Sequence, residues 1–145
     1  MKHFAKCVCL ILSLAILLAV PAQAAETSDA RSSSFFSNSS VYLYETSATT
    51  FQAWFEVTGV RRMDKIGAKE IKIQRSSDNE NWTTVATYSM DDYSTLICEN
   101  TAGHAACVTY TGTRGYYYRA YIKLYAKDEM GTATWSRYTS SIYID

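Results

Sequence analysis

The sequence predicts an all-β fold, an antiparallel sandwich of two packed sheets. After residue 41, β-branched and aromatic residues alternate with polar residues in short runs, which is the period of a half-buried strand. Glycine, or clusters of Asp, Asn and Ser, interrupt these runs roughly every eight to twelve residues. The chain has no apolar heptads and no convincing helical spacing. Short strands separated by regular turns are typical of two-sheet all-β domains.

The N-terminus has the three parts of a secretion signal. Lys2 and Lys6 precede an apolar run from Cys7 to Val20, and the small residues of Pro21 to Ala24 follow. The sequence therefore predicts a signal peptide, residues 1–24, that is cleaved after Ala24. An uncleaved membrane anchor is the alternative, but the apolar run is shorter than the roughly 20 residues that span a bilayer. We expect a secreted, extracellular protein with no membrane span after cleavage.

Cleavage would leave about 121 of the 145 residues, enough for one domain. Residues 25–40 are rich in serine and have no period, so we expect a flexible leader there and a sandwich domain over residues 41–145. Apolar residues make up 48% of the chain and charged residues 19%, which excludes a collagen-like or wholly disordered chain. Without Lys2 and Lys6, 12 basic side chains face 14 acidic ones, and this net charge of −2 excludes a basic nucleic-acid-binding protein.

The first half of the domain contains two alternating runs and a hairpin. Strands are expected at Val41 to Tyr44 and at Phe51 to Val57, where the alternation places Trp54 on the outer face. Met63 to Ala68 is the weakest segment and could form a single helical turn. Ile71 to Tyr88 predicts two strands joined by the turn-forming side chains of residues 76–81. In the leader, Phe35 and Phe36 either dock on the domain or form an exposed pair.

The second half contains the longest alternation of the chain, Tyr116 to Lys127, after a short strand at Val108 and Tyr110. Asp128 to Gly131 forms the next turn, and Trp135 to Ile144 closes the sheet. On the long strand, the face expected in the core carries Tyr116, Tyr118, Ala120, Ile122, Leu124 and Ala126. The outer face carries Tyr117, Arg119, Tyr121, Lys123, Tyr125 and Lys127.

The cysteine count predicts one disulfide bond. Cleavage would remove Cys7 and Cys9 and leave Cys98 and Cys107, an even number in an exported protein. Such a bond would close the loop between them and stabilise the fold by roughly 2.5 to 3 kcal/mol. A metal site of Cys98, His104 and Cys107 is the alternative, but a structural zinc ion needs four ligands and the mature chain has no second histidine. We expect no metal and no cofactor.

Two stretches, IKIQRSSDNENWTTVATY at residues 71–88 and VTYTGTRGYYYRAY at residues 108–121, resemble known sandwiches. They are similar to the third and sixth strand regions of the fibronectin type III-like domains of secreted bacterial proteins. The amino-acid sequence also resembles those of small secreted proteins of Gram-positive bacteria. The resemblance implies a fibronectin type III-like or immunoglobulin-like sandwich. It also implies that Tyr116 is the corner tyrosine, whose hydroxyl bonds back to the backbone.

Residue types needed for catalysis do not converge in this sequence. His104 is the single histidine of the mature chain, and no G-x-S-x-G turn is present. Asp91 and Asp92 resemble half of a glycosidase pair, but neighbouring residues of an extended chain point to opposite faces. A calcium site built from these and from Asp78 and Glu80 lacks the D-x-D-x-D-G spacing. We therefore expect no catalytic residue and no enzyme.

Twelve tyrosines and three tryptophans remain as candidate contacts. Their rings can stack on sugars or anchor a protein partner, whereas the ordinary alternative is that they cover the strand surface or are buried at sheet edges. The sequence favours a secreted binding or adhesion module for a carbohydrate or a cell-surface protein. A small glycan-active or cell-wall-active enzyme and a bacteriocin-like effector are the alternatives. The expected ligand contacts are Tyr117, Tyr121, Tyr125, Trp54 and Trp82.

Overall fold

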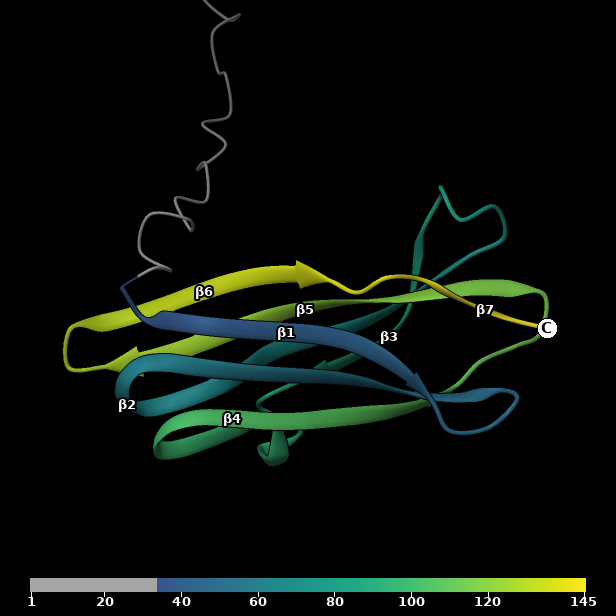
Figure 1. The fold of residues 1–145 in the computed structure, drawn as a ribbon. Helices are drawn as coiled ribbons and strands as arrows, with labels where there is room; N and C mark the ends of the chain where they lie inside the picture. Colours follow the sequence, from purple (N-terminus) through teal and green to yellow (C-terminus); the bar gives the residue numbers. More distant parts are fainter. Residues whose placement is uncertain (1–33) are drawn as a thin grey trace, which may run out of the picture.

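The computed structural model describes residues 34–145, which form seven antiparallel β-strands (Figure 1). A three-residue 3-10 turn, Ser94–Leu96, is the one helical element in this part of the chain, and no helix there is long and apolar enough to cross a membrane. The all-β, antiparallel prediction is confirmed, while the signal peptide of residues 1–24 lies outside the described residues. The strands are β1 (Phe36–Glu45), β2 (Thr50–Ser76), β3 (Thr83–Ser89), β4 (Ile97–Thr111), β5 (Tyr116–Asp128), β6 (Gly131–Tyr138) and β7 (Ile142–Ile144).

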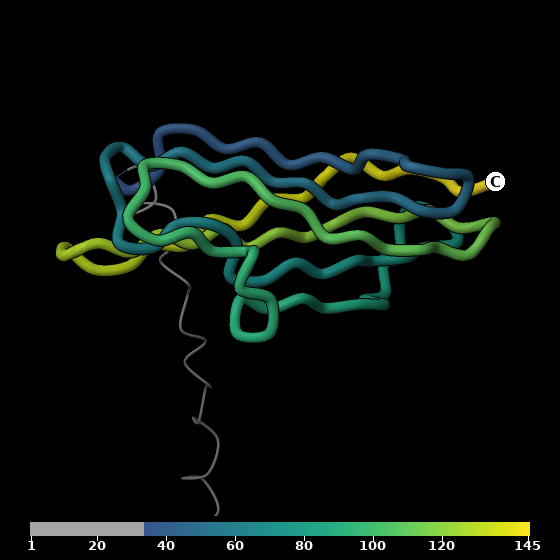
Figure 2. The backbone as a smooth tube through the Cα atoms, turned by 90° about the horizontal axis from the view of Figure 1, so that it is seen from below, coloured from purple at the N-terminus to yellow at the C-terminus, as the bar shows by residue number. Residues whose placement is uncertain are grey.

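The strands lie in two layers, and β2 belongs to both (Figure 2). Its first part, residues 50–58, pairs with β1 on one side and with β4 on the other. Its last part, residues 65–76, pairs with β5 on one side and with β3 and the start of β4 on the other. β6 and β7 pair with the far edge of β5. The β1 layer therefore has the order β1–β2–β4, and the β5 layer has the order β3–β2–β5–β6.

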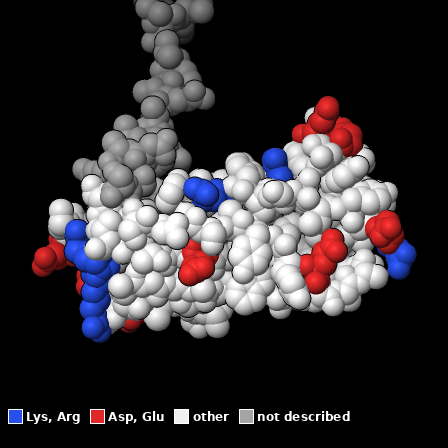
Figure 3. All heavy atoms as spheres, in the orientation of Figure 1, with Lys and Arg blue, Asp and Glu red and all other residues white. Residues whose placement is uncertain are grey.

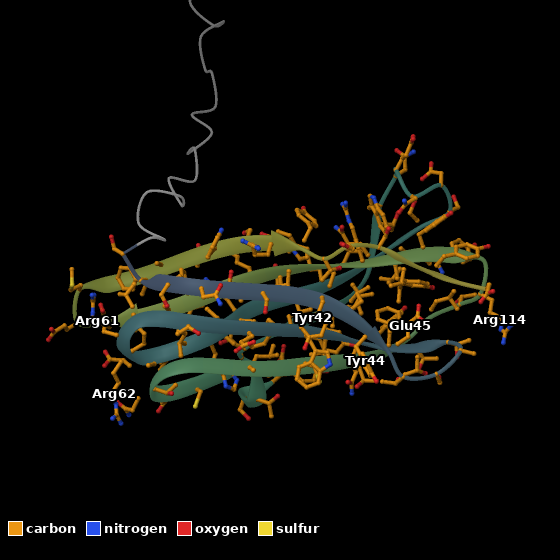
Figure 4. The ribbon with its side chains drawn as sticks, in the orientation of Figure 1. Tyr42, Tyr44, Glu45, Arg61, Arg62 and Arg114 are labelled. Carbon is orange, nitrogen blue, oxygen red and sulfur yellow. The ribbon has the colours of Figure 1, made fainter. Side chains whose placement is uncertain are left out.

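β2 turns from one layer to the other where its register with β4 shifts, between Thr58 and Met63. Residues 63–68, which the sequence allowed as a helical turn, are strand, because β4 and β5 pair with them from both sides. At this end Arg61 donates from Nε and Nη2 to the buried carboxylate of Asp128, at 2.8 and 2.5 Å (Figure 4). The bond ties the bend of β2 to the β5–β6 hairpin.

β1 begins earlier than the sequence predicts. Its first residue, Phe36, lies inside the segment 25–40 that was expected to be a flexible leader. Phe35 and Phe36 are only 4% and 5% exposed, and the ring of Phe36 lies 6.1 Å from that of Trp135. Burial of two large aromatic rings outweighs the weak strand propensity of the serines that follow. Of the two alternatives for this pair, docking on the domain is the correct one.

The core lies between the layers and follows the predicted alternation. From β2 it receives Phe51, Ala53, Phe55 and Val57, and from β5 the inner side chains from Tyr118 to Ala126. Tyr116, at the start of β5, is only half-buried. Full burial of each large apolar side chain contributes roughly 1.5 to 3 kcal/mol. The fully buried members on β5 are Tyr118, Ala120, Ile122, Leu124 and Ala126.

The bond from a tyrosine hydroxyl back to the backbone is made by Tyr118, not by Tyr116. The Tyr118 hydroxyl accepts a hydrogen bond from the Thr113 amide at 2.8 Å and donates to the Thr113 carbonyl at 3.4 Å. Gly112 makes room for this ring, because a Cβ there would lie 2.9 Å from it. Tyr116 lies at the start of β5, packs against the edge of the core, and has its ring 4.4 Å from the Arg75 guanidinium. Of these two tyrosines on the inner face of β5, the fully buried Tyr118 is the one whose hydroxyl reaches the turn.

The predicted disulfide is wrong, since Cys98 and Cys107 are both free. The segment between them is not a loop but part of β4, which follows β2 from one layer to the other. Cys98 lies opposite the fully buried Ile66, whereas Cys107 lies opposite the outward-facing Trp54. Directly paired residues share a face, so the two thiols point to opposite faces of the sheet.

Candidate functional site

A cluster of rings and cations lies on the outer surface of the β5 layer, and Arg119 is at its centre. The Arg119 guanidinium carbon lies 4.3 Å from the Trp82 ring and 4.5 Å from the Tyr138 ring. Its Nε donates a 2.8 Å hydrogen bond to Oε1 of Gln74, its direct partner on β2. Three segments, namely β2, the residue before β3 and the end of β6, therefore fix one side chain of β5. We call this surface the β5 face; it contains Lys72, Gln74, Trp82, Tyr117, Arg119, Tyr121, Lys123 and Tyr138.

Tyr121 extends the cluster along β5. Its ring lies 5.1 Å from Tyr138, its paired residue on β6, and its hydroxyl shares a 2.8 Å hydrogen bond with Ser136. The Lys72 ammonium lies 5.8 Å from the same ring and 3.0 Å from Glu70. The hydrogen bond to Glu70 raises the pKa of Lys72, so this side chain is charged at neutral pH. Arg119 and Lys72 on the β5 face thus each lie against at least one aromatic ring.

The predicted contacts on β5 are only partly brought together. Tyr121 and Trp82 join the Arg119 cluster. Tyr117 lies at the β7 end, 4.8 Å from the Tyr143 ring, and Tyr125 lies further along β5, opposite Thr134. Tyr138, which is not among the contacts predicted from the sequence, completes the cluster. Its signal was its place in the closing strand, where an antiparallel pairing brings it opposite Tyr121.

Trp54 lies on the outer surface of the other layer, as its alternation predicts, and therefore cannot share a site with Trp82. Its ring lies 6.3 Å from that of Tyr42 at an angle of 3°, and its indole Nε1 donates a 3.0 Å hydrogen bond to Gln52. Figures 3 and 4 show this side of the molecule, where few charged side chains lie over β1, β2 and β4. We call this surface the β1 face; it contains Tyr42, Tyr44, Gln52, Trp54, Glu56, Cys107 and Thr109.

The residues considered for catalysis or metal binding have other contacts. His104 Nε2 hydrogen-bonds with the Thr95 carbonyl at 2.8 Å, and its ring packs edge-on against Phe55. Asp78 accepts hydrogen bonds from Ser76 and from the Glu80 and Asn81 amides, and the bonds from Asn81 lower its pKa most. Within residues 34–145, no group of three or more His, Cys, Asp or Glu side chains is placed to hold a metal ion.

Asp91 borders two shallow hollows beside the β3–β4 connection, with volumes of about 310 and 230 Å³. The carboxylate of Glu99 in the larger hollow lies 3.0 Å from the Lys65 ammonium, and this contact raises the pKa of Lys65. Lys69, Glu70 and Lys123 line the smaller one. Charged side chains of both signs line the two hollows, together with Ser94 in the larger and Ser89 in the smaller.

No protein-family model and no curated protein matches the chain. Among solved structures, the crystal structure of Spo0M, a sporulation control protein from Bacillus subtilis, is similar over 70% of this chain, with 10% sequence identity and a TM-score of 0.41. The matched region covers 47% of that protein, so the chain spans about half its length. An identity this low assigns no function to the chain, and its own residues are the basis for one.

Proposed function

We propose that this chain is an exported, non-catalytic binding module that captures its ligand on the β5 face. The observation that carries the proposal is the Arg119 side chain, held between Trp82 and Tyr138 and bonded to Gln74. Aromatic residues and arginine supply most of the energy of binding surfaces, because they offer large rigid contact areas. Tyr138 is 54% exposed, so part of its ring is available to a ligand. The ligand is a carbohydrate or a cell-surface protein.

A fibronectin type III-like or immunoglobulin-like sandwich is part of this proposal. Support comes from the strand order, β1–β2–β4 in one layer and β3–β2–β5–β6 in the other. The hydroxyl of Tyr118 also bonds back to the Thr113 backbone at the entry to β5, a feature of that architecture. Such sandwiches serve as rigid scaffolds, and their function resides in the surfaces they present.

Export is proposed from the basic, apolar and small-residue pattern of residues 1–24. The N-terminal sequence of the protein recovered from the culture medium tests it. We expect the secreted form to begin at Ala25. Recovery of the chain only from the cell interior with Met1 or Lys2 at its start would contradict export.

A matched pair of tyrosines tests which face binds. Tyr138 on the β5 face and Tyr42 on the β1 face are 54% and 48% exposed, so either ring can be removed with little loss of core. The protein and the variants Tyr138→Ala and Tyr42→Ala are measured against immobilised polysaccharides and intact cells, together with their melting temperatures. We expect Tyr138→Ala to weaken capture by about fivefold or more, and Tyr42→Ala to leave it unchanged. Absence of capture by the unmodified protein, or loss with Tyr42→Ala alone, would contradict the proposal.

A further inference from the structure

The Arg119 guanidinium is fixed, but only one of its donor groups is used. Its carbon lies 4.3 Å from the Trp82 ring and 4.5 Å from the Tyr138 ring, and Nε donates to Gln74. Within residues 34–145 the two Nη groups have no hydrogen-bond acceptor, and no carboxylate forms an ion pair with this side chain. A guanidinium has five N–H donors in one plane. The four on the Nη atoms therefore remain for a group that approaches along the open edge.

The fixed guanidinium plane of Arg119 determines which chemical group can bind at its open edge. A guanidinium offers two parallel N–H bonds to two oxygens of one oxyanion, a geometry that a neutral hydroxyl group cannot match. Because Trp82, Tyr138 and Gln74 hold the side chain, little conformational entropy is lost when the ligand binds. The open edge of Arg119 is thus preorganised for a carboxylate or a sulfate group.

The charge of the β5 face favours the same ligand. Along the ladder that contains it, the outer positions carry five basic residues against two acidic ones, Glu70 and Glu99, and Glu99 is paired with the Lys65 ammonium at 3.0 Å. The basic residues are Lys65, Lys72, Arg119, Lys123 and Lys127. The Glu70 carboxylate is already 3.0 Å from the Lys72 ammonium. An excess of positive charge on one face raises the local concentration of polyanions and the rate at which they associate.

Tyr138 offers a surface for the sugar ring of the ligand, beside the group that Arg119 would bind. Its ring lies beside the guanidinium and is half-exposed, so a sugar ring that carries the oxyanion would meet an aromatic surface next to Arg119. Tyr121 continues this surface, with its ring 5.1 Å from that of Tyr138. Because the two rings are paired across β5 and β6, they form an aromatic surface wider than one ring, which suits a polymer of sugar rings better than a single small anion.

We infer that the β5 face binds an acidic glycan, whose carboxylate or sulfate group lies on the open edge of Arg119 and whose sugar ring packs on Tyr138. The inference rests on the proposed function and names the ligand class of the same face. A neutral glycan would leave the four Nη donors without an acceptor. An acidic peptide would use the charge but would offer no sugar ring to Tyr138.

Affinity electrophoresis of the secreted protein tests this inference, with polygalacturonate, dextran sulfate, neutral dextran or polyglutamate in the gel. We expect retardation by polygalacturonate or dextran sulfate, and these two polymers distinguish a carboxylate from a sulfate ligand. Neutral dextran should have no effect, and polyglutamate should retard the protein less than the preferred glycan. Retardation by neither acidic glycan would overturn the inference, as would equal retardation by polyglutamate or by dextran.

Variants separate recognition by Arg119 from general charge. Arg119→Gln removes the guanidinium, and Arg119→Lys retains the charge but loses the planar fork. Both should weaken retardation by about tenfold or more. Arg114→Gln is the control, because it removes an equal charge from the exposed turn between β4 and β5. Figure 4 shows Arg114 at one end of the molecule and Arg61 at the other. Binding by Arg114→Gln should be within about twofold of the unmodified protein, and melting temperatures establish that each variant is folded.

The outcomes for the inference and for the proposed function differ. If Arg119→Gln and Arg114→Gln weakened retardation by the acidic glycan equally, net charge alone would explain binding, and the acidic-glycan inference would be overturned. Capture of a neutral glycan or of cells that depends on Tyr138 but not on Arg119 would also overturn it, while the proposed binding function of the β5 face would stand. Absence of all capture would remove both.

Discussion

The two outer faces of the sandwich have similar aromatic content but differ at the residue in the middle. On the β1 face the central strand, β2, presents Trp54, with Tyr42 and Cys107 opposite it on the flanking strands. On the β5 face the central strand, β5, presents Arg119, with Gln74 opposite it and the Tyr138 and Trp82 rings on its two sides. The first arrangement satisfies its own polar group, because the Trp54 indole donates to Gln52.

The difference shows that the number of exposed rings does not by itself identify a binding face. Trp54 and Trp82 were equal candidates in the sequence, yet the first contacts a tyrosine and a glutamine and the second contacts a cation. Rings that hold a cation with unused donors leave a polar group for a ligand to satisfy. We therefore assign binding to the β5 face, and the following predictions test this difference.

The largest effect is expected in the core that supports both faces. Leu124 is fully buried on the inner face of β5, so Leu124→Ala should lower the free energy of unfolding by about 2 to 5 kcal/mol through lost burial and a cavity. Its neighbour Tyr125 lies half-buried on the outer side, and Tyr125→Ala should cost less than about 1 kcal/mol. Urea titrations of both variants measure the two values. Equal losses would mean that the outer side of β5 is covered as well.

A smaller effect is expected at the entry to β5. Tyr118→Phe removes the hydroxyl that bonds with the Thr113 backbone and should cost about 1 to 2 kcal/mol in a urea titration. Tyr116→Phe is the matched control and should cost a few tenths of a kcal/mol at most, because the ring keeps its contact with Arg75. A larger loss for Tyr116→Phe than for Tyr118→Phe would return the corner role to Tyr116.

A pH-dependent effect is expected at the turn that leads into Trp82 on the β5 face. Hydrogen bonds from Asn81, Ser76 and Glu80 hold the pKa of the Asp78 carboxyl below its ordinary value. Because the folded-state pKa is lowered, the ionised group stabilises the turn fully above its ordinary pKa of about 4, and this contribution is lost as the pH falls through the folded-state pKa.

Asp78→Ala should therefore lower the urea midpoint slightly at pH 7, and the difference from the unmodified protein should shrink as the pH falls below about 4. The same variant should weaken ligand capture more than it changes the midpoint, since the turn carries Trp82. A difference that grows on acidification would contradict the assigned sign.

No effect on binding is expected from a bulky group at Cys107, which lies on the β1 face opposite Trp54. Mass spectrometry without a reducing agent should detect two free thiols, since Cys98 and Cys107 point to opposite faces. Burial raises the pKa of the Cys107 thiol, so it should react with a maleimide more slowly than an exposed cysteine at the same pH. In a Cys98→Ser background, the labelled protein should retain ligand capture, and loss of capture would place the site on the β1 face.

Much of the fold could be predicted from local alternation. Phe51 to Val57 and Tyr116 to Lys127 each alternate with period two, and their inner residues are the core. Residues 63–68 and 98–107 could not be predicted as strand, because small, charged and glycine residues give no local pattern there. Residues 63–68 are held by pairing with β4 and β5, and residues 98–107 by pairing with β2; pairing between distant segments leaves no mark in a short window.

The candidate site was predictable in its parts but not in its assembly. The alternation of β5 placed Arg119 and Tyr121 on the outer face, and the turn chemistry placed Trp82 near a strand start. The bond from Arg119 to Gln74, however, joins residues 45 positions apart, and the contact with Tyr138 needs β6 beside β5. The false disulfide has the same origin, since it required a loop where β4 is a paired strand.

The three tryptophan indoles offer the most direct measurement of where the ligand binds. Trp82 lies on the β5 face, Trp54 on the β1 face, and Trp135 on β6 against Phe36, so each indole N–H signal reports one place. A ¹H–¹⁵N spectrum of the protein titrated with polygalacturonate fragments should shift the Trp82 indole and the Arg119 Nε signals while the Trp54 signal stays in place. Shifts at Trp54 with Trp82 unchanged, or no shift at any of the three indoles, would contradict the assignment of binding to the β5 face.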